Sequence, residues 1–265
     1  MKNLTMLISQ RLFVIKSWSA LLSVLILFLS FNSVYSDVVE VSEVSGNTII
    51  PIQQNDIRML KEVVKVNKTG MVDALFTLEN TTDKNISFLI GFPFKKEQEP
   101  SSSQNIEFGA TNTEGEFVAK INGEKATVKK EILNKYTKLK IDFEYDFIYA
   151  WRITFKPKEK KTVECLYPVL WSFARKIDPP RREFKDSREF TYITKTGALW
   201  QGTIKQADFY IDIDSGIPIE WIKQKKVKLD INPKGYKIMN YRTVEWHFEN
   251  WKPTEDISIT ILQNK

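Results

Sequence analysis

The chain has 265 residues, of which 42% are hydrophobic, 12% aromatic and 27% charged, with one cysteine and one histidine. This composition excludes a disordered chain, a collagen-like repeat and a disulfide scaffold. The formal net charge of +6 suits an anionic partner, but residues 1–36 contribute three basic and no acidic residues. Residues 37–265 therefore carry 36 basic against 33 acidic residues. We expect no nucleic-acid binding from so mild a charge.

Residues 1–36 have the pattern of a secretory signal peptide. Three basic residues lie in the first part, an uncharged apolar block follows at 20–31, and Val34 and Ser36 form a small-residue exit. The block is shorter than the roughly 20 residues that a membrane-spanning helix needs. We expect cleavage after Ser36 and an extracytoplasmic protein, periplasmic or secreted. The alternative is an uncleaved leader, which would be its contact with a membrane.

Residues 37–265 are predicted to form half-buried β-strands, because apolar and polar residues alternate with period two. The alternation recurs in seven segments, at 72–79, 85–92, 147–155, 208–213, 226–231, 243–248 and 257–262. Turn-forming sequences separate such runs, at 80–85, Asn122-Gly123 and 156–160. Short strands joined by turns predict an all-β fold, an antiparallel β-sandwich-like unit over residues 37–265. Two sandwich lobes are the alternative.

Two polar segments interrupt this strand pattern. Residues 95–105 are rich in serine and contain Pro100, which predicts a loop and marks where two lobes would divide. Residues 175–189 place six basic residues, among them Arg181 and Arg182, around a Pro-Pro pair, together with four acidic residues. We interpret this basic segment as a solvated loop, because interleaved charges cancel beyond the Debye length. The alternative is a binding site for an anionic partner.

Catalytic residue types are scarce, since Cys165 and His247 are each the single residue of their kind. Cys165 alternates with apolar neighbours on a predicted strand, so we expect a buried, inert thiol. His247 shares a strand face with Glu245 and Glu249, which predicts a solvent-facing trio. A weak metal site is the alternative there. We expect neither an enzyme activity nor a cofactor.

Three aspartates, Asp208, Asp212 and Asp214, fall on one face of a predicted strand. Their spacing differs from that of an EF-hand loop, and apolar residues lie between them. We therefore interpret them as a solvated acidic face rather than as a calcium site.

Six tryptophans follow the predicted leader. Trp151 and Trp246 lie on the apolar sides of their predicted strands, so we expect them in the core. Trp171, Trp200 and Trp251 lie at strand ends and are candidates for binding a glycan or peptide, because an exposed indole stacks on flat apolar surfaces. Packing at the rim of the core is the alternative for these three.

Residues 190–204, FTYITKTGALWQGTI, contain the motif T-G-x-x-W-x-G-x-I, with Thr196, Gly197, Trp200 and Gly202. Glycine permits a sharp turn or a positive φ, and Trp200 between the two glycines could fold back and close a corner of the sheet. The motif resembles that of the bacterial extracytoplasmic domain-of-unknown-function family 4424. Weaker similarity of pattern extends over most of the chain after the leader, at 57–63, 76–80 with 92–93, 151–158 before 163–167, and 250–261.

This resemblance implies a secreted, envelope-associated module without an assigned activity, and it supplies no catalytic residue. The sequence thus predicts a non-catalytic binding or structural module of the bacterial cell envelope, with an envelope protein or a glycan as partner. The alternative is a carbohydrate-binding or glycoside-hydrolysing protein that uses surface tryptophans and loop carboxylates. The oligomeric state is left open.

Overall fold

The computed structural model describes residues 45–47, 49–52, 56–94, 117–132, 147–169, 171–178 and 183–263. The chain divides into two units, Met1–Val38 and Val39–Lys265, and every described residue belongs to the second. The predicted leader and the predicted loop at 95–105, with its alternative lobe boundary, lie outside the described residues.

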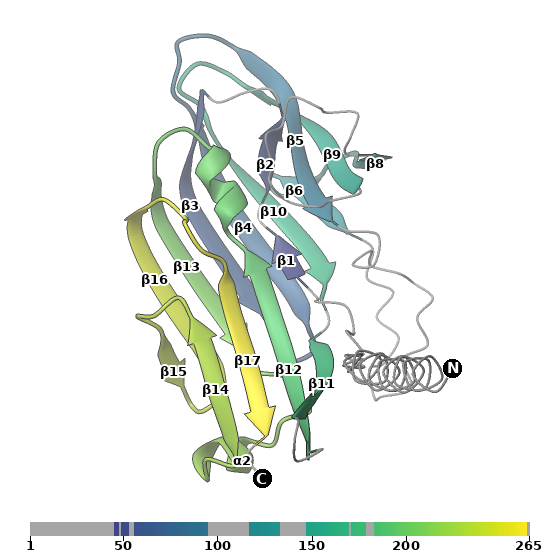
Figure 1. Cartoon of the computed structure of the whole chain (residues 1–265). Helices are drawn as coiled ribbons and strands as arrows, with labels where there is room; N and C mark the ends of the chain where they lie inside the picture. Colours follow the sequence, from purple (N-terminus) through teal and green to yellow (C-terminus); the bar gives the residue numbers. More distant parts are fainter. Residues whose placement is uncertain are drawn as a thin grey trace, which may run out of the picture. The chain divides into compact units, whose positions relative to one another are not determined.

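The described strands form three sheets (Figure 1). The eight-stranded sheet has the order β15 (Lys237–Met239), β16 (Thr243–Trp251), β13 (Ile204–Asp212), β3 (Ile57–Val66), β4 (Met71–Asn80), β10 (Lys160–Pro168), β6 (Val118–Ile121) and β7 (Glu124–Lys125). The five-stranded sheet has the order β1 (Ser45–Asn47), β12 (Glu183–Ile193), β17 (Ile257–Gln263) and β14 (Val227–Asn232), with β11 (Ser172–Asp178) paired to β12. The four-stranded sheet has the order β2 (Ile50–Ile52), β5 (Ile86–Phe94), β9 (Phe147–Phe155) and β8 (Lys129–Ile132). The described residues also form two short helices, η3 (Lys195–Leu199) and α2 (Ile219–Lys223).

The prediction of an all-β sandwich-like fold is confirmed, and each of the seven predicted strand segments lies in or overlaps an observed strand. The sheets are not wholly antiparallel, because β13 pairs with β3 and β1 pairs with β12 in parallel. Parallel neighbours require a long connection in the chain, and here more than a hundred residues separate the members of each pair.

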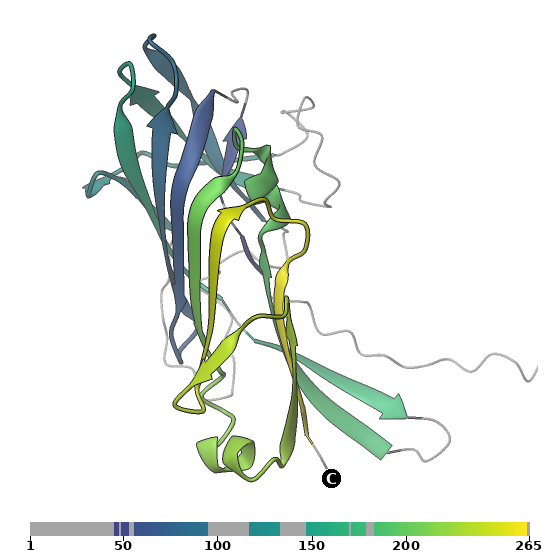
Figure 2. The same cartoon turned by 90° about the vertical axis from the view of Figure 1, so that its left-hand side faces the viewer.

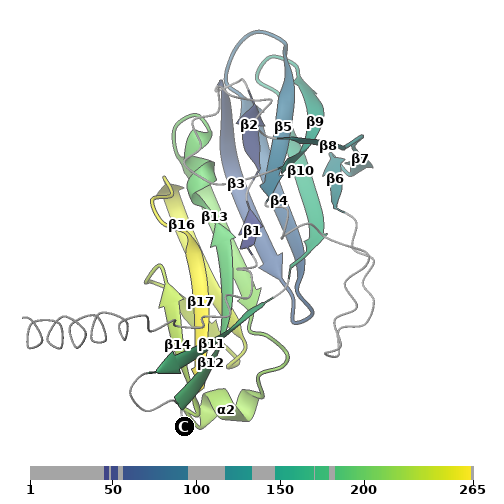
Figure 3. The same cartoon turned by 45° about the vertical axis from the view of Figure 1, so that its right-hand side comes forward.

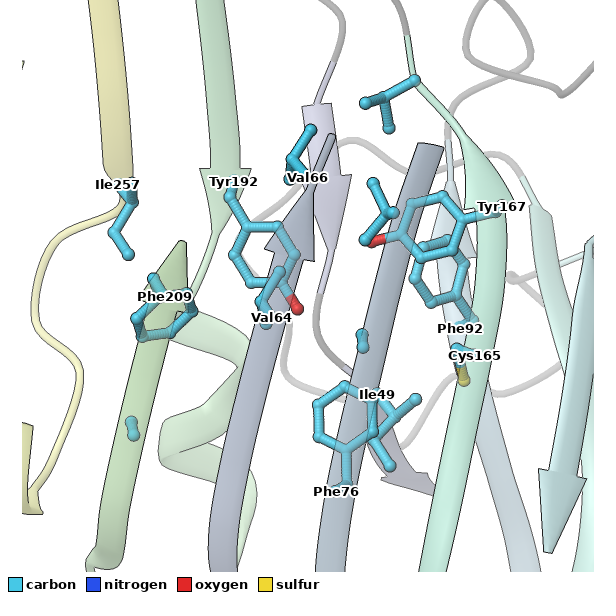
Figure 4. Close-up of a cluster of buried hydrophobic side chains, with 14 of the residues drawn as sticks. Ile49, Val64, Val66, Phe76, Phe92, Cys165, Tyr167, Tyr192, Phe209 and Ile257 are labelled. Carbon is cyan, nitrogen blue, oxygen red and sulfur yellow. The ribbon is translucent and has the colours of Figure 1, made fainter. Parts of the chain in front are cut away.

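The core lies where the two smaller sheets cover one face of the eight-stranded sheet (Figure 4). Tyr192 of the five-stranded sheet meets Phe209 of β13 edge to face, with ring centroids 5.6 Å apart. Phe92 of the four-stranded sheet lies 4.6 Å from the ring of Tyr167 in β10. One contiguous set of buried side chains is thus shared by all three sheets. Its members come from the apolar positions of the alternating strands, as period-two patterning requires.

Cys165 is confirmed as a buried thiol on the inner face of β10. Burial raises the pKa of this thiol well above its usual value, and the negative charge of Glu164 adds to the effect. The reactive form of cysteine is the thiolate, so this environment keeps the thiol inert.

A carboxyl group also lies in the core, on β3. The pairing of β3 with β4 shifts register between Met59 and Lys61, as at a β-bulge, and Glu62 then points inward and is fully buried. The Tyr192 hydroxyl donates a hydrogen bond to Glu62 Oε1 over 3.2 Å. Burial, together with Glu62, raises the pKa of Tyr192 well above its usual value. The bulge therefore explains how an acidic residue enters an apolar face.

The predicted solvated loop at 175–189 is wrong, because β11 and β12 form an antiparallel hairpin across this segment. Figures 2 and 3 show the hairpin extending away from the other strands of its sheet. Arg175 pairs with Asp186 in its register. A ladder of backbone hydrogen bonds forms whatever the polarity of the side chains, so a highly charged segment without apolar alternation can still be a hairpin. Arg181 and Arg182 lie outside the described residues.

Candidate functional site

The histidine forms part of a polar cluster on the outer face of the eight-stranded sheet. β13 and β16 are antiparallel, and their register places Asp208 directly opposite His247. Imidazole Nδ1 lies 2.6 Å from Asp208 Oδ1. The His247 side chain is 57% exposed, whereas the Asp208 side chain is only 9% exposed. Asp208 thus holds one side of the ring while the rest of the imidazole faces solvent.

Two further side chains complete this cluster. Gln206 Nε2 donates to the second carboxylate oxygen of Asp208 over 2.7 Å, and Glu249 Oε1 lies 3.4 Å from His247 Nε2. The hydrogen bond with Asp208, followed by that with Glu249, raises the pKa of His247 above its ordinary value of 6.5. Both carboxylate oxygens of Asp208 are engaged, so this group is held in one orientation.

The geometry gives no support to a nucleophile at this histidine. Cys165 lies on the inner face of the eight-stranded sheet, so a Cys-His pair does not form. The neighbour of His247 Nε2 is the carboxylate of Glu249 rather than a hydroxyl or thiol. A Ser-His-Asp arrangement needs its serine within hydrogen-bond reach of that nitrogen.

The alternative of a metal site at Glu245, His247 and Glu249 gains no support either. Glu245 lies opposite Tyr210 on β13 and Lys237 on β15. Across the part of the chain that the structure describes, no three histidine, cysteine or acidic side chains converge as a metal site requires.

The three aspartates do not form a solvated acidic face, which corrects the sequence interpretation, because none of them is fully exposed. Asp208 is held by His247, as described above. Asp212 Oδ1 accepts a hydrogen bond from Thr243 Oγ1 over 2.7 Å. Asp214 accepts from the backbone N–H of Gly216 over 2.8 Å and forms an ion pair with Arg188. Each carboxylate therefore stabilises a different local contact.

The candidate binding tryptophans do not all reach the surface. Trp200 is only 3% exposed, and its indole N–H donates to the carbonyl of Ile49 over 3.0 Å. The prediction of a surface role for Trp200 is therefore wrong, and the alternative of folding back on the sheet is correct. The reason is that the indole N–H finds a buried backbone acceptor.

The other two candidate tryptophans are half-buried, and each packs against a neighbouring aromatic ring. Trp171 contacts Phe190 of β12 at 5.4 Å between ring centroids. Trp251 stacks on Phe248 at 4.4 Å. Trp151 and Trp246 are confirmed in the core, with exposures of 1% and 2%.

The motif around Trp200 forms a corner between β12 and β13. Thr196 and Gly197 are buried within η3, and Gly202 has a φ of +73°. The side chain of Asp256 accepts hydrogen bonds from the backbone N–H groups of Thr194 and Lys195, over 3.0 and 3.1 Å. The motif residues thus shape the backbone at this corner, and their side chains form no binding surface.

The Asp208–His247 contact is the feature that sequence reasoning missed. Both residues are visible in the sequence as members of separate trios, but only the pairing of β13 with β16 brings them together. The helices in the described part of the chain are all too short or too polar to cross a bilayer.

Comparison with known proteins matches one part of the chain to a family of unassigned function. The family described as Domain of unknown function (DUF4424) matches residues 41–135. This match includes the similar segments at 57–63, 76–80 and 92–93, whereas the motif at 196–204 lies beyond it. No protein of curated function shows significant similarity to the chain.

Among solved structures, a Legionella pneumophila protein named as a candidate nutrient-binding protein superposes with a TM-score of 0.61 at 19% identity. The alignment covers 83% of this chain and 71% of that one. At this identity the similarity shows the fold alone. An M1 zinc metallopeptidase from Deinococcus radiodurans aligns with a TM-score of 0.30 at 7% identity, over 78% of this chain and 42% of that chain. A TM-score this low does not indicate a shared fold. The family resemblance predicted from the sequence is confirmed over residues 41–135, which match the domain-of-unknown-function family DUF4424.

Proposed function

We propose that the protein is a non-catalytic binding module of the bacterial cell envelope, in which the β-sheets form a scaffold for one recognition surface. That surface is the outer face of the eight-stranded sheet around Leu75, Gln206, Asp208, Tyr210 and His247, called the open face below. The observation that carries the proposal is the fixed Asp208–His247 pair on a sheet face that also exposes apolar side chains.

The open face combines oriented polar groups with exposed apolar groups. Leu75 is 39% exposed and Tyr210 is 36% exposed. The register links these strands across β3, since Asp208 pairs with Val63 and Val63 pairs with Leu75. Apolar and aromatic anchors beside preorganised hydrogen-bonding groups are typical of protein interfaces. A sheet face without a nucleophile beside its histidine suits recognition better than catalysis.

An extracytoplasmic location is part of this proposal. It is supported by the leader pattern of residues 1–36, with three basic residues, an apolar block and a small-residue exit. Cleavage after Ser36 would release residues 37–265. The solved structure with the same fold is named as a candidate nutrient-binding protein, which agrees with a binding role.

Photo-crosslinking in the native envelope tests the proposed surface. The crosslinking residue p-benzoylphenylalanine replaces Leu75, Tyr210 or, as a matched control, Ile132, which is 56% exposed on β8 of another sheet. We expect one common adduct from Leu75 and Tyr210, absent from Ile132 and suppressed by an excess of the unmodified protein. Equal adducts from all three positions, or none from Leu75 and Tyr210, would refute a partner at the open face.

A second measurement tests the absence of catalysis. The purified protein is assayed against panels of glycosides, esters and peptides, in parallel with His247→Ala and Asp208→Asn. We expect the same background rates for all three proteins. An activity that both substitutions abolish would show an enzyme and overturn the non-catalytic role.

Glycan binding by stacking on tryptophan has less support. Trp200 is buried, and Trp171 and Trp251 pack against neighbouring rings rather than lying free on the surface. Titration of tryptophan fluorescence with cell-wall glycans checks this point. A saturable shift that Trp251→Phe removes would restore the glycan alternative.

A further inference from the structure

A second surface, independent of the open face, lies where two sheet edges meet. The chain from α2 through β14 to β15 forms it, with β14 at the edge of the five-stranded sheet and β15 at the edge of the eight-stranded sheet. Figure 1 labels the three elements near one another at the C-terminal part of the chain. Lys223 Nζ lies 5.8 Å from the centroid of the Tyr241 ring, which ties α2 to the turn after β15.

This surface concentrates positive charge. Residues 219–242 contain seven basic and two acidic residues, a net charge of +5, while residues 37–265 as a whole carry 36 basic against 33 acidic residues. The rest of that region is therefore slightly acidic. The basic segment at 175–189, with six basic and four acidic residues, has a net charge of only +2. Six exposed lysines define the lysine-rich edge: Lys223, Lys225, Lys226, Lys228, Lys234 and Lys237.

Residues 219–242 contain two acidic residues, and each lies close to one lysine of the lysine-rich edge. Glu220 Oε1 lies 2.9 Å from Lys223 Nζ, and Asp230 Oδ1 lies 4.0 Å from Lys234 Nζ. Both pairs are at the surface, where ion pairs are weak and partner exchange is easy. The net field of the edge remains positive.

The same edge exposes three large apolar side chains in the turn region of the β15–β16 hairpin. Ile238, Met239 and Tyr241 are 38%, 44% and 54% exposed. They are half of the six large hydrophobic residues that are exposed among residues with described side chains. Exposed apolar residues gathered in one place indicate an interaction surface more strongly than scattered ones do.

The turn holds these side chains in a fixed arrangement. Asn240 and Tyr241 have φ values of +50° and +55°, and the backbone N–H of Arg242 donates to the carbonyl of Met239 over 2.9 Å. The Arg242 guanidinium also donates to the carbonyls of Ile213 and Asp214, over 3.0 Å each. A tyrosine at positive φ is strained, and such strain is retained where the surrounding structure enforces it.

We propose that the lysine-rich edge, with Ile238, Met239 and Tyr241, docks on the surface of an anionic lipid bilayer. Lysines near such a surface gain electrostatic attraction, and apolar and tyrosine side chains enter the interfacial layer. A soluble polyanion would engage the lysines alone. Lysines on edge strands also prevent aggregation, but exposed apolar residues on the same edge would work against that role.

Vesicle sedimentation tests the proposal on the purified protein, with the same N-terminus in every variant. The probes are vesicles of phosphatidylcholine with and without phosphatidylglycerol, and the readout is the ratio of the two partition coefficients. We expect this ratio to fall at least about tenfold for K225Q/K226Q/K228Q, because each lysine near an anionic surface contributes roughly a factor of five. The matched control, K68Q/K84Q/K156Q, removes the same charge from exposed lysines elsewhere and is expected to change the ratio far less.

The apolar contribution needs its own variant. M239S/Y241N removes two apolar groups, and asparagine tolerates the positive φ of this position better than most residues with a Cβ atom do. We expect several-fold weaker binding to anionic vesicles but unchanged binding to soluble polyphosphate. Circular dichroism and thermal unfolding show whether each variant is folded. If M239S/Y241N does not fold, I238S replaces it as the apolar variant.

Three results would overturn the proposal. The first is wild-type binding that does not depend on phosphatidylglycerol. The second is an equal loss of binding in the control lysine variant. The third is undiminished vesicle binding by M239S/Y241N, which would show that the lysines bind anionic groups without the apolar side chains. None of these results bears on the open face, since its crosslinking test uses other residues and another readout.

Discussion

Substitution of Gly202 isolates the energetic role of the family-like motif. Its φ of +73° lies in the left-handed region, while a Cβ atom added there would meet nothing closer than Arg58 Nε at 3.8 Å. Space is therefore available, and the penalty is backbone strain alone. Left-handed conformation costs an L-residue roughly 1–2 kcal/mol, with β-branched residues at the upper end. We expect about 1 kcal/mol of lost stability for Gly202→Ala and about 2 kcal/mol for Gly202→Val.

The assay is urea unfolding at 25 °C, with thermal unfolding as a second measure, where 1 kcal/mol shifts the melting temperature by about 2–4 °C for a domain of this size. Gly202→Asn is the internal control, because asparagine tolerates the left-handed region and should lose less stability than alanine. A valine variant as stable as wild type, or an asparagine variant less stable than the valine variant, would refute the reasoning from φ.

Gly70 provides the contrasting case in the same experiment. Its φ is +81°, and an added Cβ would lie 2.1 Å from the carbonyl oxygen of Val169. That overlap would also displace the hydrogen bond from the Val169 N–H to the Gly70 carbonyl, which is 2.7 Å long. We expect Gly70→Ala to cost about 3 kcal/mol or more, since strain and steric overlap combine. Equal effects of alanine at Gly70 and at Gly202 would contradict this distinction.

Three further predictions concern single side chains. Trp200→Phe should destabilise the fold by about 1–3 kcal/mol in urea unfolding, because it leaves the buried carbonyl of Ile49 without its donor; no change would show that water replaces the indole. His247 should titrate above 6.5 by NMR, and Asp208→Asn should lower that pKa, because the Asp208 hydrogen bond is the main cause of the raised value. Since the folded-state pKa is raised, the contribution of this pair is fully present below the unfolded-state pKa and disappears as pH rises through the folded-state pKa. The stability difference between wild type and His247→Gln should accordingly shrink from pH 5 to pH 9, and a constant difference would contradict the shift. Cys165 should resist thiol reagents in the native protein and react once per chain after denaturation, since it is buried and its pKa is raised; rapid native labelling would contradict its burial.

The charged hairpin formed by β11 and β12 shows where reasoning from alternation fails. Alternation detects a strand only when one face is buried in an apolar core. The residues 175–189 lack that pattern, yet they pair through the backbone from Ser172 with Glu189 to Asp178 with Glu183. Alternation also does not tell which strands are neighbours, so the sequence could not predict that β13 lies beside β3 in parallel.

The sequence by itself determined the seven strand segments with period-two alternation, the placement of Cys165, Trp151 and Trp246 in the core, and the need for glycine at residue 202. These properties depend on period-two burial and on local φ, both of which are written in short stretches of chain. Only the tertiary structure decided that Trp200 is buried beneath the segment at Ile49. The pairing of Asp208 with His247 was also decided there. The physical reason is that alternating strands have nearly the same local pattern, so their partners and register depend on packing between distant parts of the chain.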